Sequence, residues 1–274
     1  MANSVRNIAF IGSGNMASSI ISGLLESGYP AQAITATAPS QSSRSKIAQR
    51  FSVSTTADNH HAASVADVIV LSVKPQIMSD VLAKLSDIDF SNKLLISIAA
   101  GITIPRLQAM LGKPANFVRV MPNTPSLVGL GMSGLFAPEQ ISQQDKDFSG
   151  ELMQAVGKVC WVEEESQINA IIAAAGSAPA YFFLFMEAMQ KEAIAQGFDE
   201  QTARLLVEQS AAGAAQMVVE NSELELSTLR QQVTSKGGTT AEAIATFNQH
   251  QLSDTVAKAM QAAVKRAEEM ESLF

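Results

Sequence analysis

Hydrophobic and polar positions follow two different patterns along the chain. Up to about residue 164, short continuous apolar runs alternate with stretches in which apolar residues recur at helical spacing, such as Ile20, Ile21, Leu24 and Leu25. Continuous runs closed by glycine, proline or polar residues are typical of strands buried on both faces. They predict strands over residues 8–11, 33–37, 68–73, 94–98, 117–121 and 158–162. Alternation of such strands with helices predicts an α/β fold with a doubly wound parallel sheet.

From about residue 164 onward the pattern is helical. Helices are predicted over residues 168–175, 180–196, 200–220, 239–247 and 252–273, with Gly197 ending the second and Asp199 capping the third. We therefore predict an α/β domain in residues 1–165 and an all-α domain in residues 166–274. Alanine, glycine and methionine lie on more than one face of the later helices, as in residues 211–215. This is typical of helices that pack against a second chain, so we expect a homo-oligomer.

Charge and composition exclude several classes of partner. The net charge is −7, and no basic run is present, which disfavours nucleic acid and acidic membranes as partners. No apolar stretch approaches the ~20 residues of a membrane span, and the N-terminus lacks the pattern of a signal peptide. We expect a soluble cytoplasmic protein.

Cysteine and histidine add no candidate chemistry. Cys160 is the single cysteine, so an internal disulfide is excluded, and we expect this residue to be buried in its strand rather than nucleophilic. The three histidines are His60, His61 and His250, whose spacing does not predict a metal site.

The turn Gly12-Ser13-Gly14-Asn15-Met16-Ala17 follows the first strand and opens the first helix. In this position the pattern predicts a dinucleotide-binding site of the Rossmann type. Gly12 permits a tight turn, Gly14 lets the backbone approach a pyrophosphate, and Ala17 allows close packing of helix on strand. The helix N-terminus then presents free amides to the phosphates.

The end of the second strand predicts which nucleotide binds. An Asp or Glu there would bind the ribose hydroxyls of NAD, but residues 37–44 contain no acid and include Ser40 and Arg44. We therefore expect NADPH, with NADH as a possible alternative. A merely solvated helix start is the other interpretation of this segment. Asn59 is a further candidate cofactor contact.

Ligands of doubly wound sheets lie at the carboxyl ends of the strands, which adds two more candidate cofactor segments. The first is Val73-Lys74-Pro75, in which Lys74 is either catalytic, a phosphate or carbonyl contact, or structural. The second is Ala99-Ala100-Gly101, whose small residues are expected to let a nicotinamide ribose come close.

Six segments along nearly the full length of the chain form one ordered set of motifs. They are the glycine turn, Val73-Lys74-Pro75, Ala99-Ala100-Gly101-Ile102, Val118-Arg119-Val120-Met121-Pro122-Asn123-Thr124-Pro125, Gly176-Ser177-Ala178-Pro179-Ala180-Tyr181 and Val233-Thr234-Ser235-Lys236-Gly237-Gly238-Thr239-Thr240. In their order and spacing they resemble pyrroline-5-carboxylate reductase. The chain departs from that family at Lys236, where the family commonly has proline, and at Ser177-Ala178-Pro179, where it often has Gly-Pro-Ala.

The resemblance implies reduction of the imine of 1-pyrroline-5-carboxylate to L-proline by NAD(P)H, the last step of proline biosynthesis. It also implies an interlocked dimer, often assembled into larger rings such as decamers, and a dimerisation role for the all-α domain. The active site is then expected between the sheet's carboxyl edge and the helical domain. Residues expected to bind substrate are Ser235, Gly237, Gly238, Thr239, Thr240, Met121, Pro122 and Asn123.

Two residues are candidates for a catalytic role. The amides freed at Gly237 and Gly238 suit a carboxylate, and the Thr240 hydroxyl can then orient the ring nitrogen or relay a proton to it. Glu223 matches by position the family's glutamate near that nitrogen, where a carboxylate favours the iminium. The competing interpretations are that Ser235 and Thr239 only cap a helix, and that Glu223 is an exposed acid at a helix end.

Two other functions remain as alternatives. A β-hydroxyacid dehydrogenase would have a similar first domain, but it usually has a lysine early in the long interdomain helix, where this chain has only the late Lys191. A non-catalytic dinucleotide sensor would keep the glycine turn without needing residues 235–240.

Overall fold

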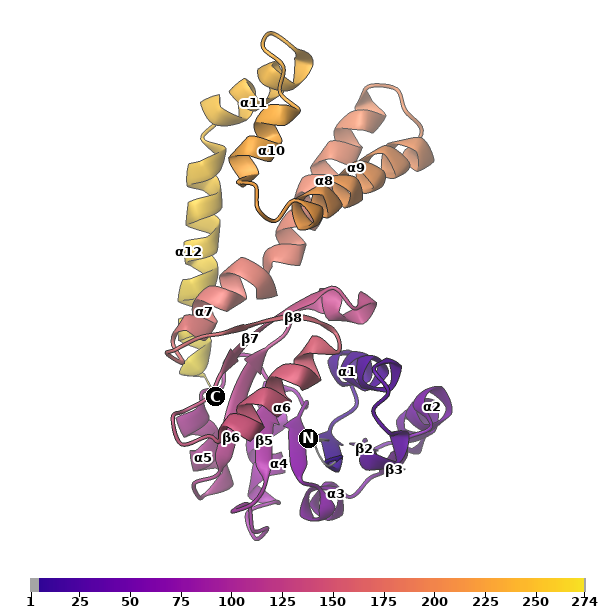
Figure 1. The fold of residues 1–274 in the computed structure, drawn as a ribbon, viewed down its shortest axis with the longest axis vertical. Coiled ribbons are helices and arrows are strands. Elements are labelled where there is room, and N and C mark those ends of the chain that lie inside the picture. Colours follow the sequence, from indigo (N-terminus) through magenta and orange to yellow (C-terminus); the bar gives the residue numbers. More distant parts are fainter. Residues whose placement is uncertain (1–4, 274) are drawn as a thin grey trace. The chain divides into compact units, whose positions relative to one another are not determined.

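The computed structural model describes residues 5–273, which form two compact units (Figure 1). The sheet unit comprises the described chain up to Ser177 together with its end from Ala263 onward, and the helical unit comprises Ala178–Ala262. The chain therefore returns to the sheet unit at its end. A division of functional domains at residue 165 stays a prediction, because packing units and functional domains need not coincide.

The sheet unit is built on one eight-stranded sheet of order β3-β2-β1-β4-β5-β6-β7-β8. All neighbouring strands pair in parallel except β6 and β7, which are antiparallel. The order reverses between β1 and β4, which creates the topological switch point where ligands bind in such sheets. The strands are β1 (Ile8–Ile11), β2 (Ile34–Thr37), β3 (Ser54–Thr56), β4 (Val68–Leu71), β5 (Leu94–Ser97), β6 (Asn116–Met121), β7 (Gly131–Phe136) and β8 (Gly157–Trp161).

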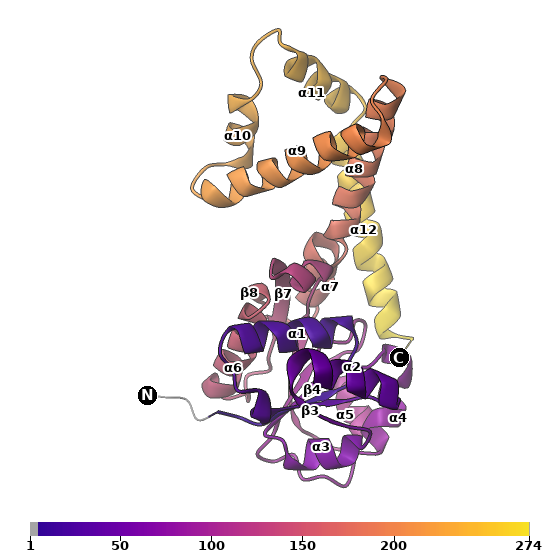
Figure 2. The ribbon, with the colours of Figure 1, turned by 90° about the vertical axis from the view of Figure 1, so that its right-hand side faces the viewer.

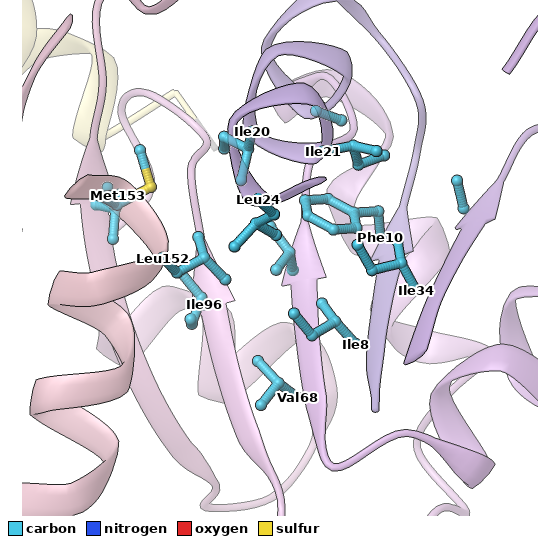
Figure 3. Packing of buried hydrophobic residues seen from close by; sticks show 14 of the residues in the cluster. Ile8, Phe10, Ile20, Ile21, Leu24, Ile34, Val68, Ile96, Leu152 and Met153 are labelled. Carbon is cyan, nitrogen blue, oxygen red and sulfur yellow. The ribbon is translucent and has the colours of Figure 1, made fainter. Parts of the chain in front are cut away.

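Helices cover both faces of the sheet, and alternate residues of each central strand contribute to two separate cores. Ile8 and Phe10 of β1 pack under α1 (Asn15–Glu26), α2 (Gln41–Phe51) and α6 (Gln143–Gln154), as Figure 3 shows for Ile20, Leu24 and Leu152. The neighbouring β1 residues pack under the helices of the opposite face, which are α3 (Asn59–Val65), α4 (Met78–Ala83) and α5 (Ile104–Leu111). Short 3-10 turns are η1 (Ala31–Ala33), η2 (Pro75–Ile77) and η3 (Thr124–Val128).

The expected strands are present, but the sheet is mixed rather than wholly parallel. Strands β3 and β7 were not expected, and β7 runs antiparallel to β6. Among the described strands, β8 pairs only with β7 and is therefore an edge strand. The prediction that Cys160 is buried is wrong, because an edge strand leaves part of its surface uncovered. Cys160 is only partly buried, and its neighbour Trp161 is 39% exposed.

The helical unit contains α8 (Ala178–Ala195), α9 (Glu200–Glu220), α10 (Leu226–Gln232), α11 (Thr239–Gln249) and the first part of α12 (Leu252–Glu271). Helices α8 and α9 lie side by side (Figure 2). The turn between them contains Gly197 at φ +107° and Asp199, whose carboxylate accepts a hydrogen bond from the Thr202 amide. The predicted end and cap of these helices are therefore confirmed.

Helix α8 exposes most of its apolar side chains. Phe182, Phe183 and Leu184 are between 65% and 69% exposed. Together with α7 (Gln167–Ile171) and the π-helix η4 (Ile172–Gly176), α8 forms one helical run that is long and apolar enough to span a membrane by length and composition. The expectation that no stretch approaches this length is therefore wrong. An apolar face of this kind is also what a helix covered by another protein chain requires.

Candidate active site

The glycine turn has the geometry that its sequence predicts. Gly12 lies at φ +100°, and a Cβ on it would meet the Ser72 carbonyl oxygen at 2.9 Å. The Gly12 amide donates to Thr37 Oγ1 at 3.1 Å, and Ser72 Oγ donates to the Gly12 carbonyl at 2.8 Å. Hydroxyl groups from β2 and from the end of β4 therefore hold the turn on both sides. Only glycine fits there, because both the φ angle and the close carbonyl exclude a side chain.

The N-terminus of α1 is free to bind an anion. Gly14 is the N-cap, no side chain caps the helix, and the first turn carries no acid. A Cβ on Gly14 would meet no atom within 4 Å, so the space in front of it is open, and Asn15 is exposed. Ser13 and Met16 are partly buried, and Ala17 is 1% exposed where the helix packs on the sheet. Uncapped amides and the helix dipole favour a phosphate at this place.

The end of β2 carries hydroxyl and guanidinium groups and no acid. Ser40 caps α2 by accepting from the Ser43 amide, and it is exposed. Arg44 Nη1 donates to the carbonyls of Ala38 and Pro39 at 2.7 and 2.8 Å. These contacts hold the guanidinium beside the strand end, where a 2′-phosphate would lie. Asn59 is the first residue of α3, is partly buried, and makes no side-chain hydrogen bond within residues 5–273.

The ends of β4 and β5 lie beside the glycine turn, because Ile11, Leu71 and Ser97 are register partners across the three strands. Beyond β4, Lys74 is exposed, while Val73 and Pro75 are partly buried. Ala99 is buried and Ala100 partly buried.

Gly101 packs against the end of α12. It lies at φ +74°, and a Cβ on it would meet Met270 Cβ at 3.1 Å. The side of Gly101 where a Cβ would lie is therefore covered by the last turn of α12, and the missing side chain makes room for this packing. The contact of residues 99–101 with a nicotinamide ribose stays a prediction.

The end of β6 contains Met121, Pro122 and Asn123, of which the last two are buried. Asn123 is bound on both sides of its amide: Nδ2 donates to the Ala175 carbonyl at 3.1 Å, and Oδ1 accepts from the Met132 amide at 2.8 Å. Pro179, four residues after Ala175, has no N–H to donate to that carbonyl in the usual helical pattern. Asn123 therefore supplies a donor to the end of η4, just before α8 begins, which indicates a positioning role.

Residues 235–240 form an exposed loop and helix start in the helical unit. Gly237 lies at φ +73°, and Gly238 is the N-cap of α11 without a side-chain cap. A Cβ on Gly238 would meet Ser235 Oγ at 2.5 Å and the Ser235 carbonyl oxygen at 3.2 Å, so a side chain there would require the Ser235 hydroxyl to move. Neither Ser235 nor Thr239 caps the helix, which leaves the first amides of α11 open to a carboxylate. Thr240 lies in this first turn and is exposed.

Glu223 lies in the turn after α9 and is exposed, as is Lys236. Neither makes an ion pair or side-chain hydrogen bond among the described residues. The candidate residues thus fall into two sets: those of the strand ends gather at one edge of the sheet, and residues 223 and 235–240 belong to the helical unit.

A buried arginine was overlooked at sequence level. Arg119 of β6 is 1% exposed, and its Nη1 lies 3.1 Å from Glu165 Oε1 and 3.0 Å from Glu271 Oε1. A charged residue inside an otherwise apolar strand was the available signal. Its two partners, far away in the sequence, were not recognisable from the chain alone.

Comparisons with known proteins agree with this division. A family model described as pyrroline-5-carboxylate reductase dimerisation matches residues 165–270, and one described as NADP oxidoreductase, coenzyme F420-dependent, matches residues 7–101. The first model includes the exposed apolar helix α8, which dimerisation would cover.

Individual relatives match over nearly the whole chain. A pyrroline-5-carboxylate reductase of Vibrio alginolyticus is 70% identical over 98% of this chain and 99% of its own. A solved pyrroline-5-carboxylate reductase from Coxiella burnetii has a TM-score of 0.92 and 45% identity over 97% and 99% of the two chains. The NADP-bound pyrroline carboxylate reductase of Plasmodium falciparum has a TM-score of 0.84 and 28% identity over 97% and 98%. The chain belongs to the pyrroline-5-carboxylate reductase family.

Proposed function

We propose that this protein reduces 1-pyrroline-5-carboxylate to L-proline with a nicotinamide dinucleotide. The observation that carries the proposal is the pair of glycine-supported anion sites, at residues 12–17 and 235–240, in a chain 70% identical to a reductase of that name. The first site suits the pyrophosphate of the nucleotide and the second the carboxylate of the substrate.

The proposed cofactor is NADPH. The related structure from Plasmodium falciparum has NADP bound. In this chain the end of β2 offers Ser40 and Arg44 and no acid, so a 2′-phosphate would meet a positive guanidinium rather than a carboxylate. NADH binds the same site without that contact and is the expected poorer donor.

The reaction depends mainly on how the protein positions the substrate and the hydride donor. Hydride adds to the imine carbon, the π pair of the C=N bond becomes the new N–H bond, and one proton is taken up at nitrogen. In this proposal the open amides at the start of α11 hold the substrate carboxylate, and the Thr240 hydroxyl orients the ring nitrogen or passes it the proton. Glu223 favours the iminium, which accepts hydride better than the neutral imine.

The proposed assembly is a homodimer through the α8–α9 region, with ten-chain rings as its larger form, in the cytoplasm. Exposed apolar side chains on these helices, including Phe182, Phe183 and Leu205, support a covering second chain. Sedimentation of the purified protein distinguishes the dimer from the ring.

The test is turnover of 1-pyrroline-5-carboxylate by the purified protein, followed at 340 nm with proline identified as the product. Thr240→Val should lower kcat at least about 100-fold, the lower end of what one general acid–base group contributes, while NADPH binding is unchanged. Thr246→Val is the matched control, because Thr246 lies on the same helix and its hydroxyl donates to the Glu242 carbonyl. Unchanged turnover of Thr240→Val would remove Thr240 from the mechanism. Absence of proline with the wild-type protein would favour a nucleotide sensor or another reductase.

Cofactor selection has its own test. Arg44→Ala should lower the affinity for NADPH by about ten-fold and leave that for NADH unchanged, because one charge-assisted hydrogen bond is worth ~1.5 kcal/mol or more. Arg50→Ala is the control at the other end of α2, where the guanidinium lies over the Phe51 ring. An equal loss for both nucleotides would contradict the role of Arg44.

A further inference from the structure

Arg119 joins three separate segments of the sheet unit. It is buried in β6 and its Nη1 contacts the carboxylates of Glu165, which precedes α7, and Glu271, the last residue of α12. The same Glu165 oxygen accepts from the Ile104 amide at 2.8 Å, at the first turn of α5. We call Arg119, Glu165 and Glu271 the clamp.

The segment between β5 and α5 lies within reach of the clamp. It contains Ala99, Ala100 and Gly101, and it is attached to Glu165 through Ile104. On its other side, Met270 lies against Gly101, whose φ of +74° and missing Cβ make room for the methionine. Met270 immediately precedes Glu271, so one turn of α12 brings both a carboxylate to Arg119 and a side chain to the loop.

Stability alone is a poor reason for such a clamp. Desolvation of a buried arginine and two carboxylates offsets much of their attraction, and apolar residues of similar size often stabilise as well. Moreover, Arg119 Nη2 is buried without a hydrogen-bond partner among the described residues. The arrangement connects three segments through directional contacts to one side chain.

We propose that the clamp is a positioning device for the nicotinamide half of the cofactor site. By holding the end of α12 on residues 99–101, it sets the loop backbone at the carboxyl end of β5, next to the switch point between β1 and β4. This inference rests on the proposed function, and it makes Glu271 and Met270 positioning residues for hydride transfer. Neither residue touches the reacting atoms.

The test compares Glu271→Ala and Met270→Ala with Glu269→Ala in the holoenzyme. Glu269 is the matched control, because it lies on the same turn and forms an exposed ion pair with Arg266. Glu271→Ala leaves Arg119 paired with Glu165. For Glu271→Ala and Met270→Ala we expect kcat/KM for NADPH to fall by about ten- to a hundred-fold, because a displacement of about 1 Å of a bound reactant can cost about a hundred-fold. The KM for 1-pyrroline-5-carboxylate should stay at the wild-type value, and Glu271→Gln, which keeps an acceptor, should recover part of the loss.

A lower melting temperature of Glu271→Ala with kcat/KM equal to that of Glu269→Ala would overturn the proposal and leave a structural role. If Glu271→Ala does not fold, the comparison of kcat/KM between Met270→Ala and Glu269→Ala tests the proposal, because Met270→Ala keeps the clamp and removes only the contact with Gly101. Absence of turnover in the wild-type protein would instead refute the proposed function. In that case the NADPH dissociation constants of the same variants still test the clamp.

Discussion

Loss of the Asn123 amide should destabilise the start of α8 in a way that depends on Pro179. Asn123 is 8% exposed, its side-chain Nδ2 donates to the Ala175 carbonyl, and its Oδ1 accepts from the Met132 amide. Asn123→Ala leaves both backbone groups without these partners. Each buried group left unsatisfied costs about 1–3 kcal/mol, so the loss of two should lower the free energy of unfolding by about 2–6 kcal/mol.

Asn123→Asp separates the two hydrogen bonds. The carboxylate that this variant introduces still accepts a hydrogen bond from the Met132 amide. It has no donor for the Ala175 carbonyl, and its second oxygen places a negative charge against that carbonyl oxygen. Urea unfolding at a fixed protein concentration measures the loss, since stability of an oligomer depends on concentration. Asn92→Ala, on an exposed turn, serves as the control and should have little effect.

Pro179→Ala provides the decisive comparison, because it restores an N–H four residues after Ala175. In the Pro179→Ala background, Asn123→Ala should lower the free energy of unfolding by about 1 kcal/mol less than it does in the wild-type protein. A coupling of this size is expected for groups that act on the same partner. An equal cost of Asn123→Ala with and without Pro179 would refute the argument that Asn123 replaces the missing proline donor.

Two further predictions concern the glycine turn and the helical unit. Gly12→Ala should weaken NADPH binding at least about ten-fold by titration, because its Cβ would meet the Ser72 carbonyl at 2.9 Å and its φ is +100°. Gly28→Ala, at φ +87° with no atom within 4 Å of a Cβ, is the control for backbone strain alone, and an equal effect on binding would contradict the prediction. Hydrogen bonds from the Thr202 hydroxyl and amide lower the pKa of the Asp199 carboxyl below its ordinary 3.8. The ionised Asp199 carboxylate therefore stabilises α9 at any pH above the pKa of the carboxyl in the unfolded chain. This stabilisation is lost as the pH falls through the lower pKa of the folded state. Asp199→Ala should lower the melting temperature at neutral pH, with a difference from wild type that shrinks in acid; a difference independent of pH would exclude the carboxylate.

Local features of the fold could be predicted from local patterns. The runs at residues 8–11 and 68–71 form central strands, because an apolar residue at every position suits a strand buried on both faces. The turn at Gly12 and the cap at Asp199 each depend on a few adjacent residues, and the structure confirms both. Strand β3 has only three residues, none of them apolar, and in β7 glycine and serine interrupt the apolar residues, so neither strand forms a continuous apolar run.

The sequence by itself determined the strand–helix alternation, the nucleotide turn, the open helix start at Gly238 and the family. Only the tertiary structure decided that β7 runs against its neighbour and leaves Cys160 on an edge strand, that Met270 covers Gly101, and that Glu271 reaches Arg119. The physical reason is distance along the chain. Periodicity, caps and turns reflect interactions among near neighbours, whereas the partner of a buried charge, or the side chain that fills the space beside a glycine, depends on which distant segments pack together.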